Sequence, residues 1–441
     1  MPLPPDTGSL NVGSFWEESV GSIQEDPKLF GEAAFDFAIV GAGFTGLSAA
    51  IALTGAGASV CILEAGRVGW GASGRNGGFC CLGGSKLSDR QMVRRYGLDQ
   101  ARAYFDYQCE AIEAVSNRLE SYQIEADRHS HGEIYLAHRP SDFAGFAEEA
   151  RFLDDSYGIK ARVLSPGDLR TEGIAGPEFH GGLHVPVGFA LNPMKYVQGL
   201  ARKARARGVR IYARSPATGI EPALDGAWSL KTPEGTVRAG KVILAGNAYA
   251  REDTPAWLKG RLFPVMSSIL VTRPLTDAEL SDQGWTSDLM ASDTRTLLHY
   301  FRLLPDRRFL FGTRGGLFET QSSLSRMHAA ARDDFDRMFP AWRGVETSHA
   351  WYGHVCLTRD LVPYVGPVPR MDGVFAAMAW HGSGIAMASL SGEKLAELAL
   401  GRIGQDSLPQ AITAPPRKFP LPALRGAYLQ GAYWWYALQD R

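Results

Sequence analysis

Cysteine and net charge are both scarce in this chain. Its 441 residues include five cysteines, an odd and small number that predicts a reducing compartment and no framework of disulfides. The 46 Lys and Arg residues nearly balance the 47 Asp and Glu residues, so the formal net charge is −1. A chain with this balance has no overall attraction to nucleic acid or to an anionic membrane. We interpret its one basic run, at residues 202–207, as the solvated face of a helix.

Long apolar runs are also missing. Outside one glycine-rich segment, no apolar run reaches the roughly 18 residues that a transmembrane helix needs. The first residues lack a basic stretch followed by an apolar one, so we expect no secretory signal and predict a cytoplasmic protein. With 45% hydrophobic residues, the chain is long enough to bury two cores, which predicts two domains.

Residues 37–64 hold the most informative pattern, a strand, a glycine-rich turn, a helix and a second strand that ends in an acidic residue. In such a unit Gly41 permits a tight turn, Gly43 lets the backbone approach a pyrophosphate, and Gly46 lets the helix pack close to the strand. Glu64 is placed to hold ribose hydroxyls and would repel the 2′-phosphate of NADP. The alternative is an ordinary turn in which the glycines serve packing only, but the complete pattern favours a dinucleotide site.

The segment that follows distinguishes FAD from NAD. Residues 65–78 read AGRVGWGASGRNGG and include six glycines. A loop with so many accessible backbone amides suits a phosphate or a ribityl chain, and a simple NAD enzyme does not need it. The alternative is a flexible surface loop, but Trp70 and Phe79 favour burial.

At these residues the chain resembles the D-amino-acid-oxidase-like flavoproteins, in their γ-glutamylputrescine oxidoreductase branch. The resemblance extends over nearly the whole chain. It rests on SFW at 14–16, GWGASGRNGG at 69–78, VILAGNAY at 242–249, YFRLL at 300–304 with FG at 311–312, DLVPYVG at 360–366 and HGSG at 381–384. It implies an α/β (α+β) fold, in which an FAD-binding, Rossmann-like domain with a parallel sheet joins a substrate domain with a mostly antiparallel sheet and helices.

The resemblance also implies a discontinuous domain organisation. We expect an N-terminal arm that packs on the surface, two interleaved domains and a C-terminal tail that packs on the body. The arm is 1–34, the FAD-binding domain 35–90, 187–250 and 350–403, the substrate domain 91–186 and 251–349, and the tail 404–441. Strands are predicted at 241–246 in the first domain and at 266–272, 299–304 and 309–312 in the second.

The segment 374–400 is predicted to be a strand, a glycine turn and a helix. The helix N-terminus and the amides of residues 382–385 would stabilise the negative charge of a reduced flavin. His381 would add a hydrogen-bond donor, or alternatively would bond only to backbone at the strand end. We expect Gly384 to adopt backbone angles that only glycine visits cheaply.

Compared with its relatives, the chain lacks a basic clamp for an amino-acid carboxylate. The family's amino-acid oxidisers carry a basic residue just after the His-Gly turn, where this chain has Ser383 and Gly384. We therefore predict an amine whose charged group lies farther from the reacting nitrogen or that has no carboxylate. Arg75, Arg302 or Arg314 remains available for a distal carboxylate.

The predicted reaction is hydride transfer from the carbon next to a neutral amine to flavin N5, followed by hydrolysis of the imine to an aldehyde and an amine or ammonia. An aromatic pocket would favour the neutral amine. Leu310 stands where sarcosine-oxidase relatives have a lysine that promotes reaction with O₂, so the electron acceptor is O₂, a quinone or a carrier protein. We expect non-covalent FAD, a small-molecule amine substrate and no metal.

Two groups of site residues are predicted. The catalytic and substrate-binding residues are Tyr300, Arg302, Tyr352, Trp380 and His381, with His299 and Trp351 nearby. The FAD-binding residues lie in the glycine-rich turns or at strand ends: Gly41, Gly43, Phe44, Thr45, Gly46, Glu64, Ala65, Arg67, Gly71, Ala72, Ser73, Arg75, Asn76, Gly77, Gly78, Ala217, Gly246, Asn247, Gly366, Gly382, Ser383, Gly384 and Ile385.

Two other functions remain open. One is a quinone-linked D-amino-acid dehydrogenase, for which the aromatic residues 433–436 would anchor the protein at a membrane surface. Those residues would alternatively pack back on the body. The other is a nucleic-acid-modifying flavoprotein or a module with structural FAD, which would need a basic surface with interleaved aromatics. The sequence does not indicate an oligomeric state.

Overall fold

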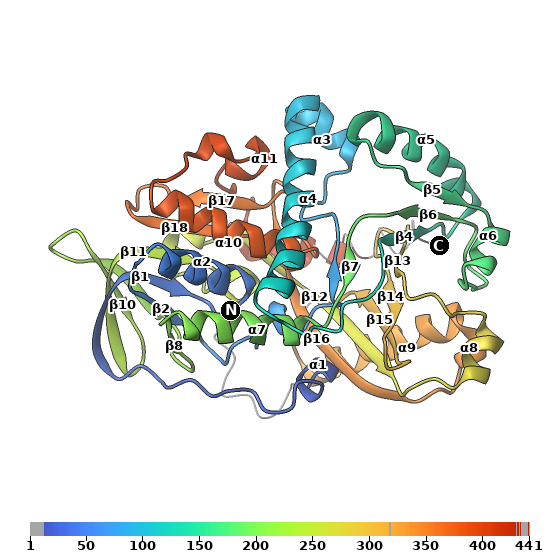
Figure 1. Ribbon diagram of the computed structural model, residues 1–441, viewed down its shortest axis with the longest axis horizontal. Coiled ribbons are helices and arrows are strands. Elements are labelled where there is room, and N and C mark those ends of the chain that lie inside the picture. The colour runs from blue at the N-terminus through green and yellow to red at the C-terminus, as the bar shows by residue number, and fades with distance from the viewer. Residues whose placement is uncertain (1–12, 317–318, 429, 432, 434–439, 441) are drawn as a thin grey trace.

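The computed structural model describes residues 13–316, 319–428, 430–431, 433 and 440, which form two eight-stranded sheets and a two-stranded ribbon (Figure 1). The first sheet has the order β17-β18-β11-β1-β2-β8, and a hairpin of β9 and β10 extends it from β11. The strands are β1 Gly31–Val40, β2 Val60–Leu63, β8 Arg210–Tyr212, β9 Gly219–Pro222, β10 Trp228–Lys231, β11 Gly235–Leu244, β17 Tyr364–Pro367 and β18 Val374–Met378. The five strands from β8 to β18 run parallel.

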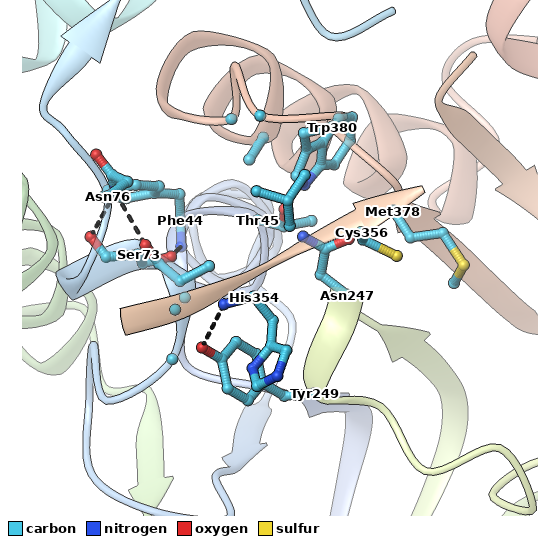
Figure 2. Close-up of a pocket in the computed structure, with 18 of the residues that line it drawn as sticks. Phe44, Thr45, Ser73, Asn76, Asn247, Tyr249, His354, Cys356, Met378 and Trp380 are labelled. Carbon is cyan, nitrogen blue, oxygen red and sulfur yellow. Dashed lines mark hydrogen bonds between the residues drawn. The ribbon is translucent and has the colours of Figure 1, made fainter. Parts of the chain in front are cut away.

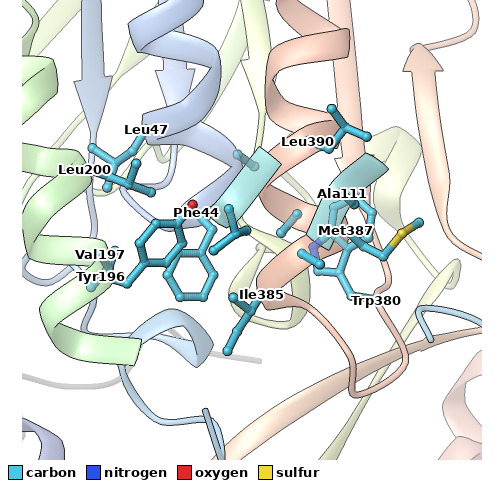
Figure 3. Packing of buried hydrophobic residues seen from close by; sticks show 14 of the residues in the cluster. Phe44, Leu47, Ala111, Tyr196, Val197, Leu200, Trp380, Ile385, Met387 and Leu390 are labelled. Atoms are coloured by element: carbon cyan, nitrogen blue, oxygen red, sulfur yellow. The ribbon is translucent and has the colours of Figure 1, made fainter. Parts of the chain in front are cut away.

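The central strands of this sheet are apolar because both of their faces are covered. Helices α2 Phe44–Gly55, α7 Pro193–Ala206 and α10 Ile385–Ala399 lie together over one face, and the long helix α4 Leu98–Ser121 packs on α10 (Figure 1). Figure 3 shows how side chains of these helices interdigitate, with Phe44, Tyr196 and Ile385 close together. On the other face a second core includes Cys61, Leu230 and Val242.

The second sheet has the order β16-β12-β15-β14-β13-β4-β6-β5 and is antiparallel except where β13 meets β4. Its strands are β4 Glu133–Leu136, β5 Arg162–Leu164, β6 Gly182–Val185, β12 Leu262–Thr272, β13 Met290–Asp293, β14 Tyr300–Leu303, β15 Phe309–Arg314 and β16 Thr347–Thr358. The ribbon pairs β3 Phe79–Cys80 with β7 Phe189–Ala190. The remaining α-helices are α1 Phe15–Glu18, α3 Asp89–Tyr96, α5 Pro140–Tyr157, α6 Pro166–Thr171, α8 Asp277–Gln283, α9 Gln321–Met338 and α11 Gln410–Thr413.

Alternation along β15 separates a core from a functional face. Phe309 and Phe311 enter an aromatic core that also contains Phe335 of α9. Leu310 faces the opposite way and packs with residues of the first sheet's helices. Because side chains alternate along a strand, Arg314 shares the face of Leu310. The second sheet therefore turns one face to its own helix and the other toward the first sheet.

Two details of the predicted organisation are wrong. Strand β16 pairs with β12 along its whole length, so residues 350–358 belong to the substrate sheet rather than to the FAD-binding part. The predicted arm 1–34 overlaps the first sheet, because β1 begins at Gly31 and pairs with β11 from that residue on. Strand pairing explains both results. Trp16 of the arm is 2% exposed and its Nε1 donates to the carbonyl of Asn76 at 2.8 Å, as a buried indole requires.

The C-terminal tail contacts β12 of the substrate sheet, where the ring of Phe419 lies 5.7 Å from that of Phe263 and Arg425 donates to the carbonyl of Leu262. It also contacts the loop before β14. The carboxylate of Asp440 accepts hydrogen bonds from the amides of Thr296 and Leu297, each at 2.9 Å. Apart from Tyr433, the aromatic residues 433–436 of the proposed membrane anchor lie outside the described residues. In the part of the chain that the structure describes, no helix has the length and apolar character needed to cross a bilayer.

The basic run at 202–207 serves the fold. Arg205 forms a two-pronged ion pair with Asp26, at 2.8 and 2.7 Å, and Arg207 donates to the carbonyl of Ile51. Guanidinium groups engaged in this way are not available as a surface for phosphates.

Candidate active site

One cavity of about 460 Å³ lies where the parallel strands of the first sheet end. Its wall includes the last residues of four strands, Val40, Leu63, Leu244 and Met378. The carboxyl ends of parallel strands are the usual ligand-binding edge of an open α/β sheet. The cavity then continues to the second sheet, where Tyr300, Arg314 and Glu133 line it. A single space thus joins the dinucleotide-binding edge to a chamber on the antiparallel sheet.

The first glycine turn brings backbone segments so close together that a side chain at Gly41 or Gly46 would not fit. A Cβ atom on Gly41 would lie 2.9 Å from the carbonyl oxygen of Ala245, and one on Gly46 would lie 2.0 Å from that of Gly41. Gly41 also has φ +110°, which other residues rarely adopt. Gly43 is the N-cap of α2 and provides no capping side chain, so the helix end faces the cavity with its backbone.

Glu64 is fixed at the cavity wall by backbone donors. Its Oε2 accepts from the amide of Ala42 at 2.7 Å, and its Oε1 accepts from the amide of Gly66 at 2.8 Å. Burial raises the pKa of Glu64, while these backbone hydrogen bonds oppose the rise. A carboxylate oxygen can accept more than one hydrogen bond, so Glu64 retains acceptor capacity for a ligand hydroxyl.

The second glycine-rich loop is held together by its own polar side chains. Asn76 donates to the carbonyls of Ala72 and Ser73 and accepts from the amide of Gly78, and the hydroxyl of Ser73 accepts from the amide of Phe44 (Figure 2). The loop is therefore closed against the first turn of α2. Arg75 is buried beneath it, donates to the carbonyl of Trp70 at 2.6 Å and lies 5.2 Å from that indole ring.

Most of the predicted cofactor-binding residues line this cavity. They are Gly41, Gly43, Phe44, Thr45, Glu64, Ala65, Gly71, Ala72, Ser73, Arg75, Asn76, Gly77, Ala217, Gly246, Asn247, Gly382, Ser383, Gly384 and Ile385. Their glycine cradle, the acidic side chain at the end of β2 and the helix end fit a flavin dinucleotide. Cys356 also lines the cavity, and burial raises the pKa of its thiol to about 12, which disfavours the reactive thiolate.

Four predicted cofactor-binding residues do not line the cavity, and one of them is Gly46, which lets α2 approach the backbone of Gly41. Arg67 points away from the cavity and forms an ion pair with Glu17 at 2.7 Å. Gly78 makes room behind the loop, since a Cβ there would lie 2.1 Å from the carbonyl oxygen of Leu191. Gly366 lies on the edge strand β17, where a Cβ would meet the side chain of Gln405 at 2.5 Å. A sequence motif does not distinguish residues that contact a ligand from those that shape the backbone around it.

The expectation that His381 donates to the cofactor is also wrong. Its Nδ1 lies 3.0 Å from the carbonyl oxygen of Gly84, and its Nε2 accepts from the amide of Thr358 at 3.2 Å. Both ring nitrogens are therefore used by backbone groups, which requires a neutral imidazole with the proton on Nδ1. Burial lowers the pKa of His381 to about 4. His381 instead ties the turn before α10 to the loop at Gly84 and to the end of β16.

In that turn Gly382, rather than Gly384, requires glycine. Gly382 has φ +111°, whereas Gly384 has φ −102° and ψ −15°, angles that any residue adopts. Gly382 also adjoins a cation from another strand, since a Cβ on it would lie 2.5 Å from Nη2 of Arg314. The turn itself thus has no basic residue, as its sequence predicts, but the space beside it is occupied by the guanidinium of Arg314.

The predicted substrate residues divide into two groups. Tyr300, Trp380 and His381 line the cavity, and the hydroxyl of Tyr300 lies 3.0 Å from that of Ser267. Arg302 and Tyr352 do not line it. Arg302 is fully buried behind the glycine-rich loop, while Tyr352 packs in a separate cluster with Met266, Leu324 and Met327.

His299 and Trp351 are also turned away from the cavity. His299 lies between Asp293, at 2.6 Å, and Asp334, at 3.3 Å. Burial alone would lower its pKa, but hydrogen bonds and the charges of the two carboxylates outweigh burial and raise the pKa to about 9. Trp351 donates from Nε1 to the carbonyl of Arg75 at 2.9 Å and so supports the loop.

Sequence reasoning missed several polar residues of the chamber. Glu133 and Tyr135 of β4, Ser292 of β13 and Lys86 of the loop before α3 all line the cavity. The i, i+2 spacing of Glu133 and Tyr135 places both on one face of a strand, a signal that the sequence does contain. Lys86 has no such signal, because it lies in an irregular segment.

Comparison with known proteins places the chain among flavoenzymes. Residues 36–398 match the family described as FAD dependent oxidoreductase (DAO). The chain is 30% identical over 393 residues to the gamma-glutamylputrescine oxidoreductase of Escherichia coli, covering 89% of each protein. It is 30% identical over 430 residues to a probable oxidoreductase, OrdL, of Rhizobium meliloti, covering 97% of each.

Solved structures share the fold at low sequence identity. Glycine oxidase from Geobacillus kaustophilus superposes with a TM-score of 0.68 at 22% identity, over 84% of this chain and 96% of that one. L-proline dehydrogenase from P. horikoshii gives 0.68 at 18% identity, over 86% of this chain and 98% of that one. The predicted fold class, with a largely parallel sheet and a mostly antiparallel one, is confirmed.

Proposed function

This chain belongs to the DAO family of FAD dependent oxidoreductases, which act on amines and amino acids, and we propose that it oxidises a C–N bond of an amine that has no carboxylate on the reacting carbon. The substrate would be a primary or secondary amine of polyamine or γ-glutamylated type. The observation that carries the proposal is the single cavity that joins the dinucleotide-binding edge to a chamber on the second sheet.

The cofactor would be held by the glycine turn of α2, by Glu64 and by the loop 69–77. When bound, FAD supplies an acceptor for a hydride. The protein contributes the N-terminal end of α10, whose partial positive charge and backbone amides at 382–385 line the same cavity. We expect these groups to stabilise negative charge that develops at this end of the cavity during the reaction.

The chamber favours the reactive form of the substrate. Only a neutral amine has the lone pair that assists loss of hydride from the neighbouring carbon. Tyr300 and Trp380 give the chamber aromatic walls, and an apolar environment penalises the ammonium form. Loss of a hydride from carbon and a proton from nitrogen leaves an imine. Water then adds to the imine carbon, and the C–N bond breaks to give an aldehyde and an amine or ammonia.

The substrate class is supported by what surrounds the turn before α10. Ser383 and Gly384 offer no positive side chain for an α-carboxylate. Among known proteins, a relative of 30% identity is named gamma-glutamylputrescine oxidoreductase. Both observations favour an amine whose charged end lies away from the reacting carbon.

A second candidate is an amino-acid dehydrogenase, and one observation favours it. The guanidinium of Arg314 lies beside Gly382, so a cation does stand near the turn, although another strand provides it. An arginine there would suit a carboxylate close to the reacting carbon as well as a distant one.

Anaerobic reduction of the bound flavin tests both candidates. The panel comprises putrescine, γ-glutamylputrescine, sarcosine, D-alanine and L-proline. We expect putrescine and γ-glutamylputrescine to bleach the flavin absorption with the highest second-order rate constants of reduction. A higher rate constant for D-alanine, sarcosine or L-proline than for both of them would reject the proposed function. Peroxide formed after air is admitted then distinguishes O₂ from a quinone or carrier as the electron acceptor.

A further inference from the structure

Glu133 presents a buried carboxyl group to the cavity without a cationic partner. It is 7% exposed and lies on β4 in the chamber wall. Its Oε1 accepts from the hydroxyl of Ser292 at 2.9 Å and its Oε2 from that of Tyr135 at 3.2 Å. Within the described residues no Lys, Arg or His nitrogen lies within ion-pair distance of this group. A buried carboxylate with neutral partners only is costly, so a cation from a ligand would complete the site.

Arg314 presents a guanidinium group to the same cavity, also without a partner of opposite charge. Its guanidinium carbon lies 5.7 Å from the ring centroid of Tyr300. Of the described residues, none forms a hydrogen bond or an ion pair with its side chain. The planar guanidinium is suited to bind a carboxylate through two parallel hydrogen bonds.

Lys86 links these two groups electrostatically. Its side chain lines the cavity that also contains Glu133 and Arg314. Burial lowers the pKa of Lys86 to about 8, the charge of Arg314 lowers it further, and the charge of Glu133 opposes both. Lys86 thus lies near enough to both groups to interact with their charges, so the chamber holds two basic side chains and one carboxyl group. Burial raises the pKa of Glu133, and a ligand cation beside it would favour the ionised form.

We propose that Glu133, Arg314 and Lys86 form a subsite for the far end of the substrate, and that this end is a zwitterionic amino-acid head group. The carboxylate of the ligand would bind Arg314 and Lys86, and its ammonium would bind Glu133. A ligand with only a carboxylate would leave Glu133 unpaired, and a ligand with only ammonium groups would be repelled by the two cations. The inference rests on the proposed function, and it assigns the distal charge of that substrate to named side chains.

Four amides of putrescine test the subsite, because they differ only at the far end. The γ-glutamyl amide carries both charges, the glutaryl amide only the carboxylate, the 4-aminobutyryl amide only the ammonium, and the butyryl amide neither. We expect kcat/KM to be highest for the γ-glutamyl amide. Removal of either charge should lower kcat/KM by at least about tenfold, since a site built for a polar group rejects the analogue that lacks it.

Variants assign each charge to its partner. Glu133→Gln should abolish the preference for the γ-glutamyl over the glutaryl amide and leave kcat/KM of the glutaryl amide within about twofold of wild type. Arg314→Gln should abolish the preference for the γ-glutamyl over the 4-aminobutyryl amide in the same way. Glu125→Gln and Arg170→Gln, at exposed positions, are the matched controls and should keep the wild-type order.

A binding measurement separates this inference from the proposed reaction. The non-reacting probe is γ-glutamylmethylamide, and its binding is measured by the change that it causes in the absorption spectrum of the flavin. If no putrescine amide is turned over but this probe binds, and binding weakens at least about tenfold in Glu133→Gln and Arg314→Gln, the subsite stands and the proposed reaction fails. If the amides are turned over and both variants lower kcat/KM equally for all four, the subsite is wrong. A wild-type enzyme that does not prefer the γ-glutamyl amide also overturns it.

Discussion

The guanidinium of Arg314 occupies the space that a side chain at Gly382 would need. A Cβ on Gly382 would come within 2.5 Å of Nη2 and 3.4 Å of Nη1. The missing side chain of one residue thus positions the charge of another, on a strand far away in the sequence. The turn has no cationic residue of its own, but the guanidinium of Arg314 lies beside it. Gly382 and Arg314 together define the substrate-side end of the cavity.

Gly382→Ala should therefore displace Arg314 and strain the turn. With φ +111°, an alanine at this position costs roughly 1–2 kcal/mol in backbone conformation alone. We expect a lower Tm and a reduction rate for the bound flavin that falls by about tenfold, equivalent to about 1.4 kcal/mol. Thermal unfolding and anaerobic single-turnover kinetics measure the two effects. Gly384→Ala is the control, because its angles suit any residue, and it should behave like the wild type in Tm. Equal effects of the two substitutions would show that the contact with Arg314 is unimportant.

Glu64→Ala should weaken retention of FAD. The substitution removes the acceptor for the amides of Ala42 and Gly66 as well as the predicted acceptor for ribose hydroxyls. Hydrogen bonds to a charged group contribute about 1.5–3 kcal/mol each, so Kd should rise by at least about tenfold. Flavin content after dialysis and fluorescence titration of the apoprotein measure this change. Glu64→Gln keeps one acceptor oxygen, so its Kd for FAD should lie between those of the wild type and Glu64→Ala. Unchanged flavin content in Glu64→Ala would contradict a role for this carboxylate at the cofactor.

The dinucleotide unit was predictable because its requirements are local. Gly41, Gly43 and Gly46 follow from the spacing of a turn and a helix start, and Glu64 follows from the end of the second strand. Alternation also located β14 and β15 to within a few residues. In each case the pattern and its structural cause lie within one continuous stretch of chain.

The charged residues of the chamber were not predictable in the same way. Arg302 and Arg314 lie on neighbouring antiparallel strands, and only the packing of the glycine-rich loop buries one and leaves the other in the cavity. His381 is satisfied by Gly84 and Thr358, which are distant in sequence. The i, i+2 spacing of Glu133 and Tyr135 indicates that they share a face of a strand, but it does not indicate that this face lines a cavity. Sequence patterns report periodicity, whereas these roles depend on which elements meet in space.

His381 should make stability depend on pH below neutrality. The pKa of this histidine is about 4 in the folded protein, against roughly 6.5 when unfolded, so the unfolded state binds more protons between these values. The stabilisation is therefore complete above about pH 6.5 and is lost as pH falls toward 4, on the order of 3 kcal/mol in total. Urea unfolding at a series of pH values measures this slope. His381→Gln should show a shallower dependence in that window, and an unchanged slope would mean that the imidazole is not held neutral.

His299 should act in the opposite direction and at higher pH. Its pKa is raised to about 9 between Asp293 and Asp334, so the folded state keeps a proton that the unfolded state loses above about pH 6.5. The stabilisation is complete below that pH and is lost as pH rises through 9. Urea unfolding between pH 6 and 10 should show this decline in the wild type and a flatter profile in His299→Gln. Since His299 does not line the cavity, the order of preference among amine substrates should not change.

Arg302 and Arg314 should respond differently to substitution although the sequence offered both as carboxylate partners. The Nε of Arg302 donates to the carbonyl of Gly77 at 3.0 Å and its Nη2 to that of Leu191 at 2.9 Å. Its Nη1 lies 2.8 Å from Nε2 of His129, so the guanidinium is fully engaged in holding the glycine-rich loop.

Arg302→Lys cannot reproduce this fork of donors and would leave buried carbonyls without partners, each at a cost of about 1–3 kcal/mol. We expect a lower Tm and a lower flavin content, with the ratio of kcat/KM between the glutaryl and butyryl amides unchanged. Arg314→Gln should do the reverse, keeping Tm and flavin content while that ratio falls by about tenfold. The two variants are thus controls for each other. If Arg302→Lys changed the ratio and Arg314→Gln did not, the carboxylate would bind behind the glycine-rich loop, and the cavity described here would not be the substrate site.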